Sequence, residues 1–279
     1  MVRATLIIAH LTFMEARRRR IVLAALLGGL AFLLVYAAAV VAIERSLTAG
    51  PIDEVMHRVQ LQFLTLAGLY VANFLTVAAA ILLPVDTLSG EIDSGVMQTL
   101  ASKPVRRSEI LLGKWLTYWL MSGAYLVLLA GGCVLVMRFA AGFEQQNLQR
   151  ALPLMLLGAT VVLTVSLAGG VRLKTITNGM AAFAFYGLAF IGGWVEQIGA
   201  IVRNDGAQRI GTAISLLSPP DAMWRRAAYE LQPQSLRDLG PVQPFSVASV
   251  PSTAMTVWTI GFVLVVLAFA LVQFRRRPL

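Results

Sequence analysis

Residues 84–115 read PVDTLSGEIDSGVMQTLASKPVRRSEILLGKW, and this stretch decides how the rest of the chain is organised. It holds eight charged residues and lies between two long apolar runs, residues 61–83 and 110–137. A charged side chain is costly inside a bilayer, so the charged part of this stretch is expected outside the lipid core. We call residues 84–114 the polar island. The sequence thus predicts a polar segment held between two membrane spans.

The composition of the whole chain agrees with a membrane protein. Of its 279 residues, 58% are hydrophobic and 13% are charged, whereas soluble domains carry about 25% charged residues. The apolar residues form six blocks of the length that a helix needs to cross a bilayer, about 20 residues. The sequence therefore predicts an all-α, polytopic integral membrane protein with a single transmembrane domain over residues 1–279. The expected spans are residues 21–43, 61–83, 110–137, 152–171, 176–195 and 255–274.

The N-terminal segment is expected to be an anchored part of the protein. The first apolar block is too long for the apolar region of a cleaved signal, and its arginines lie at residues 17–20. Before it, Arg3, His10 and Arg17 recur every seven residues with apolar residues between them. This spacing favours a helix lying in the membrane interface with one polar stripe. A simple extension of the first span is the alternative.

The distribution of charge predicts the orientation. With six spans, the side that carries both termini holds 14 basic and 5 acidic residues, and the opposite side holds 9 of each. Basic loops remain in the cytoplasm, so both termini and the polar island are expected there. The net charge of +9 is therefore interpreted as a feature of membrane topology, and no nucleic-acid partner is expected.

The polar island itself predicts a short helix with turns on both sides. Ser89-Gly90 is expected to break the chain, and Glu91 with Asp93 then falls in a first helical turn, where negative charge is favourable. An apolar face of Val96, Met97 and Leu100 follows. Such a helix can dock into a groove on another protein. An ordinary amphipathic loop helix fits the composition equally well.

Two other classes of function are less favoured by the residues. An ion-driven carrier needs ionisable groups within the membrane, and the six blocks carry none away from their ends. An intramembrane protease needs a nucleophile with a base, but His10 and His57, the two histidines, both lie outside the blocks. Leu112-Gly113-Lys114 does not complete a phosphate-binding loop, because Ser108 and Trp115 occupy the positions that require Gly and Ser or Thr. No catalytic, cofactor or metal residues are predicted in this chain.

The island resembles the segment between the second and third spans of ABC-2-type exporter permeases. The resemblance implies the six-span fold, a coupling helix seated on a separate ABC ATPase subunit that binds ATP and Mg, and a second permease copy or a paralogue. It also implies export across a bacterial inner membrane. The matching residues are Gly90, Glu91, Gly95, Val96, Leu100, Pro104, Arg107, Ile110, Leu111, Leu112, Gly113 and Lys114. The expected ATPase-coupling residues are Gly90, Glu91, Asp93, Gly95, Val96, Leu100, Pro104 and Arg107.

Polar and aromatic residues within the spans are candidates for lining a substrate path, although packing between helices is their more common role. These candidates are Asn73, Thr160, Thr164, Ser166, Phe183 and Tyr186. Trp115, Tyr118 and Trp119 are instead expected to form an aromatic belt at the inner membrane interface.

Between the last two spans, residues 197–252 predict two short helices on, or dipping into, the outer leaflet. Asp221 is expected to cap the second helix, whose apolar face carries Trp224, Ala228 and Leu231. Residues 215–229, SLLSPPDAMWRRAAY, resemble a stretch of the ABC-2 permease subgroup that includes the membrane subunit of the nitrous-oxide reductase maturation transporter. This second resemblance implies a small copper- or sulfur-related cargo and a periplasmic accessory protein. Lipids of the membrane are the remaining expected partner.

Overall fold

The protein is described by a computed structural model that covers residues 2–47, 54–93, 106–233 and 247–277. The regular secondary structure in these ranges is entirely helical, which confirms the all-α class. Six of the described helices are long and apolar enough to cross a membrane. These are α2 (Arg20–Leu47), α3 (Glu54–Leu82), α6 (Arg107–Ala141), α7 (Leu148–Gly170), α8 (Thr175–Ile201) and α12 (Thr253–Arg276).

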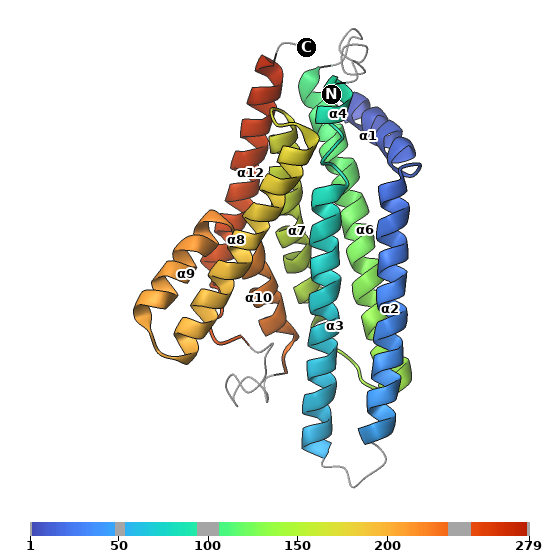
Figure 1. Ribbon diagram of the computed structural model, residues 1–279, viewed down its shortest axis with the longest axis vertical. Helices are drawn as coiled ribbons and strands as arrows, with labels where there is room; N and C mark the ends of the chain where they lie inside the picture. The colour runs from blue at the N-terminus through green and yellow to red at the C-terminus, as the bar shows by residue number, and fades with distance from the viewer. Residues whose placement is uncertain (1, 48–53, 94–105, 234–246, 278–279) are drawn as a thin grey trace.

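The long helices run side by side along the long axis of the molecule (Figure 1). The most apolar window of α3 and of α7 is 61% buried, whereas that of α2 is only 17% buried. The core of the bundle therefore lies around α3 and α7, and α2 presents most of its apolar surface outward. In a bilayer this surface faces lipid or another subunit, because only an apolar environment accepts it without cost.

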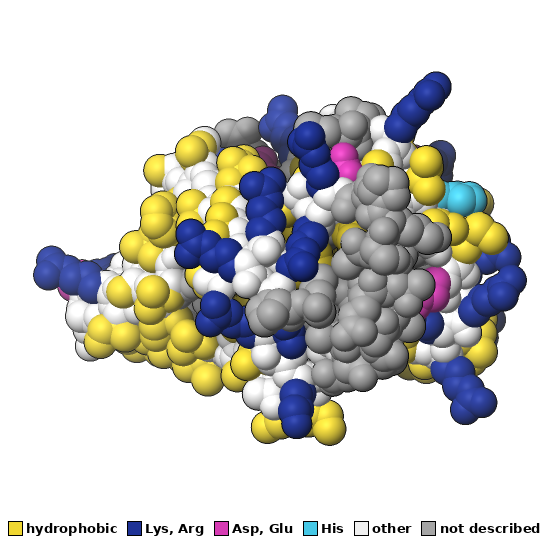
Figure 2. Space-filling model, turned by 90° about the horizontal axis from the view of Figure 1, so that it is seen from above, with side chains coloured by type: hydrophobic (Ala, Val, Ile, Leu, Met, Phe, Trp, Pro, Cys, Tyr) yellow, Lys and Arg dark blue, Asp and Glu magenta, His cyan; other side chains and the backbone are white. Residues whose placement is uncertain are grey.

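One end of the bundle carries both termini and the connection from α3 towards α6 (Figure 1). Figure 2 looks onto this end and shows Lys and Arg side chains spread across it. We call it the basic end. The even number of spans places both termini on one side of the membrane, and the expectation that this side is cytoplasmic stays a prediction.

A separate helix, α1 (Val2–Ala16), precedes the first span. Turns at residues 17–19 divide α1 from α2, so the alternative of a continuous extension is wrong. The helix packs against α6, where the Thr117 hydroxyl donates a hydrogen bond to the Ala9 carbonyl at 2.8 Å. A Cβ on Gly113 would lie 2.8 Å from Ile8 Cγ2 and 2.9 Å from the Thr5 carbonyl oxygen. Gly113 therefore lets α1 approach α6 closely.

Two shorter helices, α9 (Asp205–Leu217) and α10 (Pro220–Leu231), lie towards the other end of the bundle. The predicted apolar face of α10 is confirmed, since Trp224, Ala228 and Leu231 are all buried. The predicted cap is wrong. Pro219 occupies the cap position, and Asp221 lies inside the first turn with its side chain directed to Arg225.

Replacing Gly113 by Leu should lower the free energy of unfolding by about 1–3 kcal/mol, because the side chain would push α1 away from α6. Unfolding can be followed with a thiol-reactive dye, since Cys133 is the single cysteine of the chain and is buried. Gly131→Leu is a matched control on the same helix, because a Cβ there meets nothing within 4 Å. Equal stability of the two variants would contradict the close-approach role of Gly113.

Candidate functional site

The candidate site is the junction, which we define as residues 83–91, where α3 leads into α4 (Ser89–Asp93) at the basic end. The predicted break at Ser89-Gly90 is wrong, because both residues lie inside α4. The Ser89 hydroxyl donates to the Val85 carbonyl at 3.2 Å, and the Gly90 amide donates to the Asp86 carbonyl at 2.9 Å. These bonds continue the chain as a helical turn where the sequence suggests an interruption.

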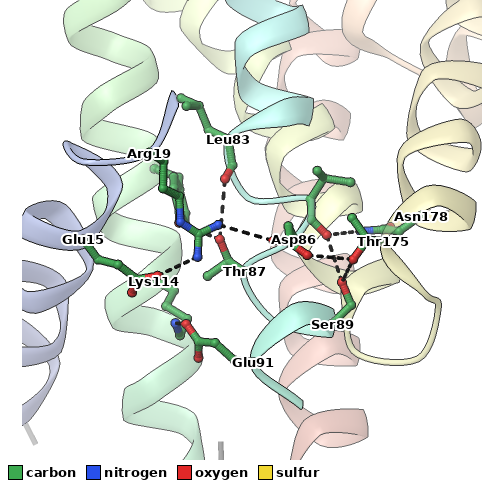
Figure 3. Close-up of polar contacts among 12 residues, drawn as sticks. Glu15, Arg19, Leu83, Asp86, Thr87, Ser89, Glu91, Lys114, Thr175 and Asn178 are labelled. Carbon is green, nitrogen blue, oxygen red and sulfur yellow. Dashed lines mark hydrogen bonds and ion pairs between the residues drawn. The ribbon is translucent and has the colours of Figure 1, made fainter. Parts of the chain in front are cut away.

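A buried ion pair joins the junction to α6 (Figure 3). Lys114 Nζ lies 2.5 Å from Glu91 Oε1, and the side chains are only 3% and 9% exposed. The two residues are 23 positions apart and stand near the two ends of the polar island. A buried charge is tolerated when an opposite charge and hydrogen bonds compensate it. The pair therefore fixes α4 against the start of the third span.

A second contact between the same elements is made by Thr87 and Tyr118, whose hydroxyl oxygens lie 2.5 Å apart. Tyr118 is 1% exposed. Its predicted place in an interfacial aromatic belt is therefore wrong, because its hydroxyl is used inside the protein. The junction thus has two polar contacts with α6.

The tryptophans of α6 also face inward. Trp115 and Trp119 stack with ring centroids 6.2 Å apart. Their indole N–H groups donate to the hydroxyls of Thr164 and Thr160 on α7, each at 3.0 Å. Each threonine also donates back to a carbonyl of its own helix at 2.7 Å, which is the common role of threonine in such helices.

On its other side, the junction is bonded to α8. Thr175 Oγ1 donates to Asp86 Oδ1 at 2.8 Å and lies 2.8 Å from the Ser89 hydroxyl (Figure 3). The buried Asn178 amide donates to the Ser166 carbonyl at 2.8 Å and to the Val85 carbonyl at 3.4 Å. The first turn of α8 and the end of α7 are therefore tied to the junction.

Arg19 brings the N-terminal region to the junction. Its guanidinium lies 2.6 Å from Glu15 and 3.9 Å from Asp86. The carboxylates of both partners are half exposed, so solvent screens these pairs and each contributes about 1 kcal/mol or less. Their effect is to orient the turn between α1 and α2 next to the junction.

At the far end of the polar island, Arg107 starts α6 and reaches the end of α12. Its guanidinium donates to the carbonyls of Phe274, Arg275 and Arg277. A cation at a helix C-terminus is favourable, because the last carbonyls lack partners within the helix. The Arg106 amide donates to Glu109 Oε2 at 3.0 Å, which caps α6. Both described ends of the island are thus attached to the bundle.

Three members of the predicted coupling set, Gly90, Glu91 and Arg107, have their contacts within the protein. Glu91 pairs with Lys114, Arg107 binds α12, and Gly90 lies against Asp86, whose Oδ1 would be 2.5 Å from an added Cβ. Asp93 lies in α4, while Gly95, Val96, Leu100 and Pro104 lie outside the described residues. The pairing with Lys114 was not predicted. The sequence feature that could have indicated it is the presence of opposite charges near the two ends of the island.

The predicted path-lining residues are spread over α3, α7 and α8. The three on α7 are buried, and the Ser166 hydroxyl donates to the Ile81 carbonyl at 3.0 Å. Asn73 on α3 and Tyr186 on α8 are buried, while Phe183 is 39% exposed. The hydroxyls of Thr160, Thr164 and Ser166 therefore make hydrogen bonds within or between helices. A path-lining role for the six residues stays a prediction.

A second buried charge cluster joins the short helices to α8. The Arg225 guanidinium lies 2.9 Å from Glu196 and 3.1 Å from Asp221. It also donates to the Ser215 hydroxyl at 3.0 Å, and the Ser249 hydroxyl donates to Glu196 at 2.6 Å. The cluster unites α8, α9, α10 and the segment before α12. Within the described ranges, no three His, Cys, Asp or Glu side chains are grouped as a metal site requires.

Asp221 and Glu196 share the guanidinium of Arg225 in this cluster. The pKa of Asp221 is shifted mainly because this carboxyl group is buried. Burial raises the pKa of Asp221 to about 6, although Arg225 acts in the opposite direction and Glu196 adds to the rise. Glycines of α8 and α9 make room for the charges. A Cβ on Gly193 would lie 1.8 Å from Asp221 Oδ2, and one on Gly211 would lie 2.5 Å from the Glu196 backbone nitrogen.

Lys114→Met should lower the free energy of unfolding by about 3–5 kcal/mol, because it leaves Glu91 buried without its cation. The double variant Glu91→Gln/Lys114→Met should recover most of this loss. Arg138→Met is the control, since Arg138 and Glu144 form an exposed pair at 3.3 Å and should cost about 1 kcal/mol or less. Dye labelling of Cys133 during unfolding measures all three. A double variant no better than Lys114→Met would contradict the pairing.

Asp221→Asn should remove a pH dependence. The ordinary pKa of Asp is about 4, and the pKa of Asp221 in the folded protein is about 6. Between these two pH values the folded protein holds a proton that the unfolded chain has lost. The wild type therefore loses stability as pH rises through this window, on the order of 3 kcal/mol, and Asn does not titrate. Thermal unfolding across this range compares the two. Asp205→Asn, exposed on α9, is the control, and an identical profile for both variants would refute the assignment.

Comparison with known proteins identifies the family. Residues 6–279 match the family model described as ABC-2 family transporter protein. A search of curated proteins gives no match. Members of this family are multi-pass permease subunits that generally work with a separate ABC ATPase. Since the match spans nearly the whole chain and the six apolar helices agree with it, the protein belongs to the ABC-2 transporter family, as the membrane permease subunit of an ABC transporter.

Proposed function

We propose that this permease exports its cargo across a bacterial inner membrane, driven by a separate ATPase that binds the polar island. The observation that carries the proposal is the attachment of the island at both described ends. Glu91 is paired with Lys114 at one end, and Arg107 is bonded to α12 at the other. A force applied to the island would therefore pass directly to α4, α6 and α12.

The contacts of the junction support a division of roles within the island. Its described residues hold the segment in place, as Glu91 and Asp86 do through Lys114 and Thr175. The residues that touch the ATPase are then those of the predicted apolar face, Val96, Met97 and Leu100, together with Gly95 and Pro104. In this scheme ATP and Mg bind to the partner subunit, and closure of two ATPases shifts two islands.

The assembly that we propose contains two permeases, either two copies of this chain or one with a paralogue. The outward apolar surface of α2 supports it, since the window of this helix is only 17% buried. The basic end, with both termini, faces the cytoplasm by the charge rule. The helices α9 and α10 then lie on the outer side, where they can meet a periplasmic accessory protein.

The nature of the cargo follows only from the narrower resemblance of residues 215–229. A member of the nitrous-oxide maturation subgroup would deliver a small copper- or sulfur-related species. The family match is to the broader ABC-2 family and does not support this subgroup. We therefore propose only how the permease is driven. Its cargo would be selected by residues of the spans.

The experiment is co-purification of the chain with the ATPase encoded beside it. Leu100→Asp should weaken the complex by at least about tenfold, because an apolar contact in a docking groove is replaced by a charge. Leu173→Asp is the matched control, being the same change in the turn between α7 and α8 at the same end. Dye labelling of Cys133 verifies that both variants are folded. Unchanged ATPase recovery with Leu100→Asp would overturn the proposed docking role.

A further inference from the structure

An apolar cavity of about 650 Å³ lies where α1, α2 and α6 meet near the basic end. This volume is in the range of sites that take a small molecule, about 300–1,000 Å³. Its inner wall is made by Ala79 of α3 and Leu83 of the junction, and its sides include Ala25 of α2 and Ala124 of α6. The alanines leave space where a larger side chain would fill the gap between helices.

The walls of the cavity are held by hydrogen bonds. The Tyr125 hydroxyl donates to the Ala25 carbonyl at 2.7 Å and joins α6 to α2. The Thr117 hydroxyl donates to the Ala9 carbonyl at 2.8 Å and joins α6 to α1. Both hydroxyl protons are used inside the protein, and most of the remaining lining is apolar. An occupant must therefore be apolar along most of its length.

The side of the cavity formed by α1 is basic. His10 and Arg17 contribute to its lining and are exposed. Arg18 and Arg20 beside them are also exposed, while Arg19 is paired with Glu15 and Asp86. An anionic group at this position would neutralise Arg17 by a charge-assisted hydrogen bond. The cavity thus combines an apolar interior with a cationic rim.

The helix α1 places this rim at the surface of the bilayer. Its side chains Leu6, Ile7, Leu11, Phe13 and Met14 are each between 43% and 60% exposed. A helix with such a surface and basic residues lies at the boundary between headgroups and acyl chains. The rim is therefore at headgroup depth, and the interior of the cavity is at the depth of the acyl chains.

We propose that this cavity holds one acyl chain of an anionic glycerophospholipid, with its phosphate at Arg17. The lipid comes from the leaflet at the basic end and bridges α1, α2 and α6. Because α1 leads to Arg19 and Asp86, an occupied cavity also steadies the junction. This inference concerns lipid binding by the permease and does not depend on the ATPase.

The test uses the full-length chain in phosphatidylcholine vesicles that contain a phosphatidylglycerol with a photoreactive group at the end of one acyl chain. After illumination, mass spectrometry should find the label on α2 and α6 around Ala25 and Ala124. Ala124→Trp fills the cavity and should abolish this labelling. Leu135→Trp, on an exposed position of the same helix outside the cavity lining, should leave it unchanged.

The headgroup contact is tested by competition with unlabelled lipids. Arg17→Gln should reduce the preference for phosphatidylglycerol over phosphatidylcholine by about tenfold, the loss of one charge-assisted hydrogen bond. Arg18→Gln removes the same charge beside the cavity and should preserve the preference. If Ala124→Trp does not fold by Cys133 labelling, Ala25→Leu takes its place. Equal labelling of filled and wild-type cavities, or the same headgroup preference in Arg17→Gln and Arg18→Gln, would overturn the proposal.

Discussion

The ion pair between Glu91 and Lys114 is the contact on which the basic end of the protein depends. It holds a charged segment against the start of a membrane span in a place where water has little access. Two opposite charges are stable there only together, because either one alone would be buried without compensation. The contacts of Thr87 with Tyr118 and of Asp86 with Thr175 add to it and make the junction a rigid part of the bundle.

The span pattern was predictable from the sequence because it depends on length and apolar content alone. The six predicted blocks correspond to α2, α3, α6, α7, α8 and α12, and the helices extend beyond most of the blocks. The family was predictable from the spacing of residues in the polar island. The buried face of α10 was also predictable, since Trp224, Ala228 and Leu231 recur at helical spacing.

The errors share a physical cause, which is that a contact made in the folded protein overrides the preference of the residue type. Asp221 has the residue type of a cap, but Arg225 and the burial beside Glu196 draw its side chain away. Tyr118 has the residue type of an interfacial belt, but Thr87 occupies its hydroxyl. Glu91 was expected in a first helical turn, and its pairing with Lys114, 23 residues away, was not predicted. A local sequence pattern indicates where a residue type is usually found, whereas a tertiary contact can place that residue elsewhere.

The buried cluster around Arg225 has a consequence for how the chain enters the membrane during synthesis. The helix α8 has the lowest hydropathy of the six spans, 1.3 against 1.8–2.5 for the others, and it carries Glu196. Arg225 leaves the ribosome 29 residues after Glu196. A nascent chain that ends before α10 would present an unpaired carboxylate to lipid, which is costly. We therefore expect the fifth span to gain its full stability only after α9 and α10 have followed it and Arg225 has paired with Glu196.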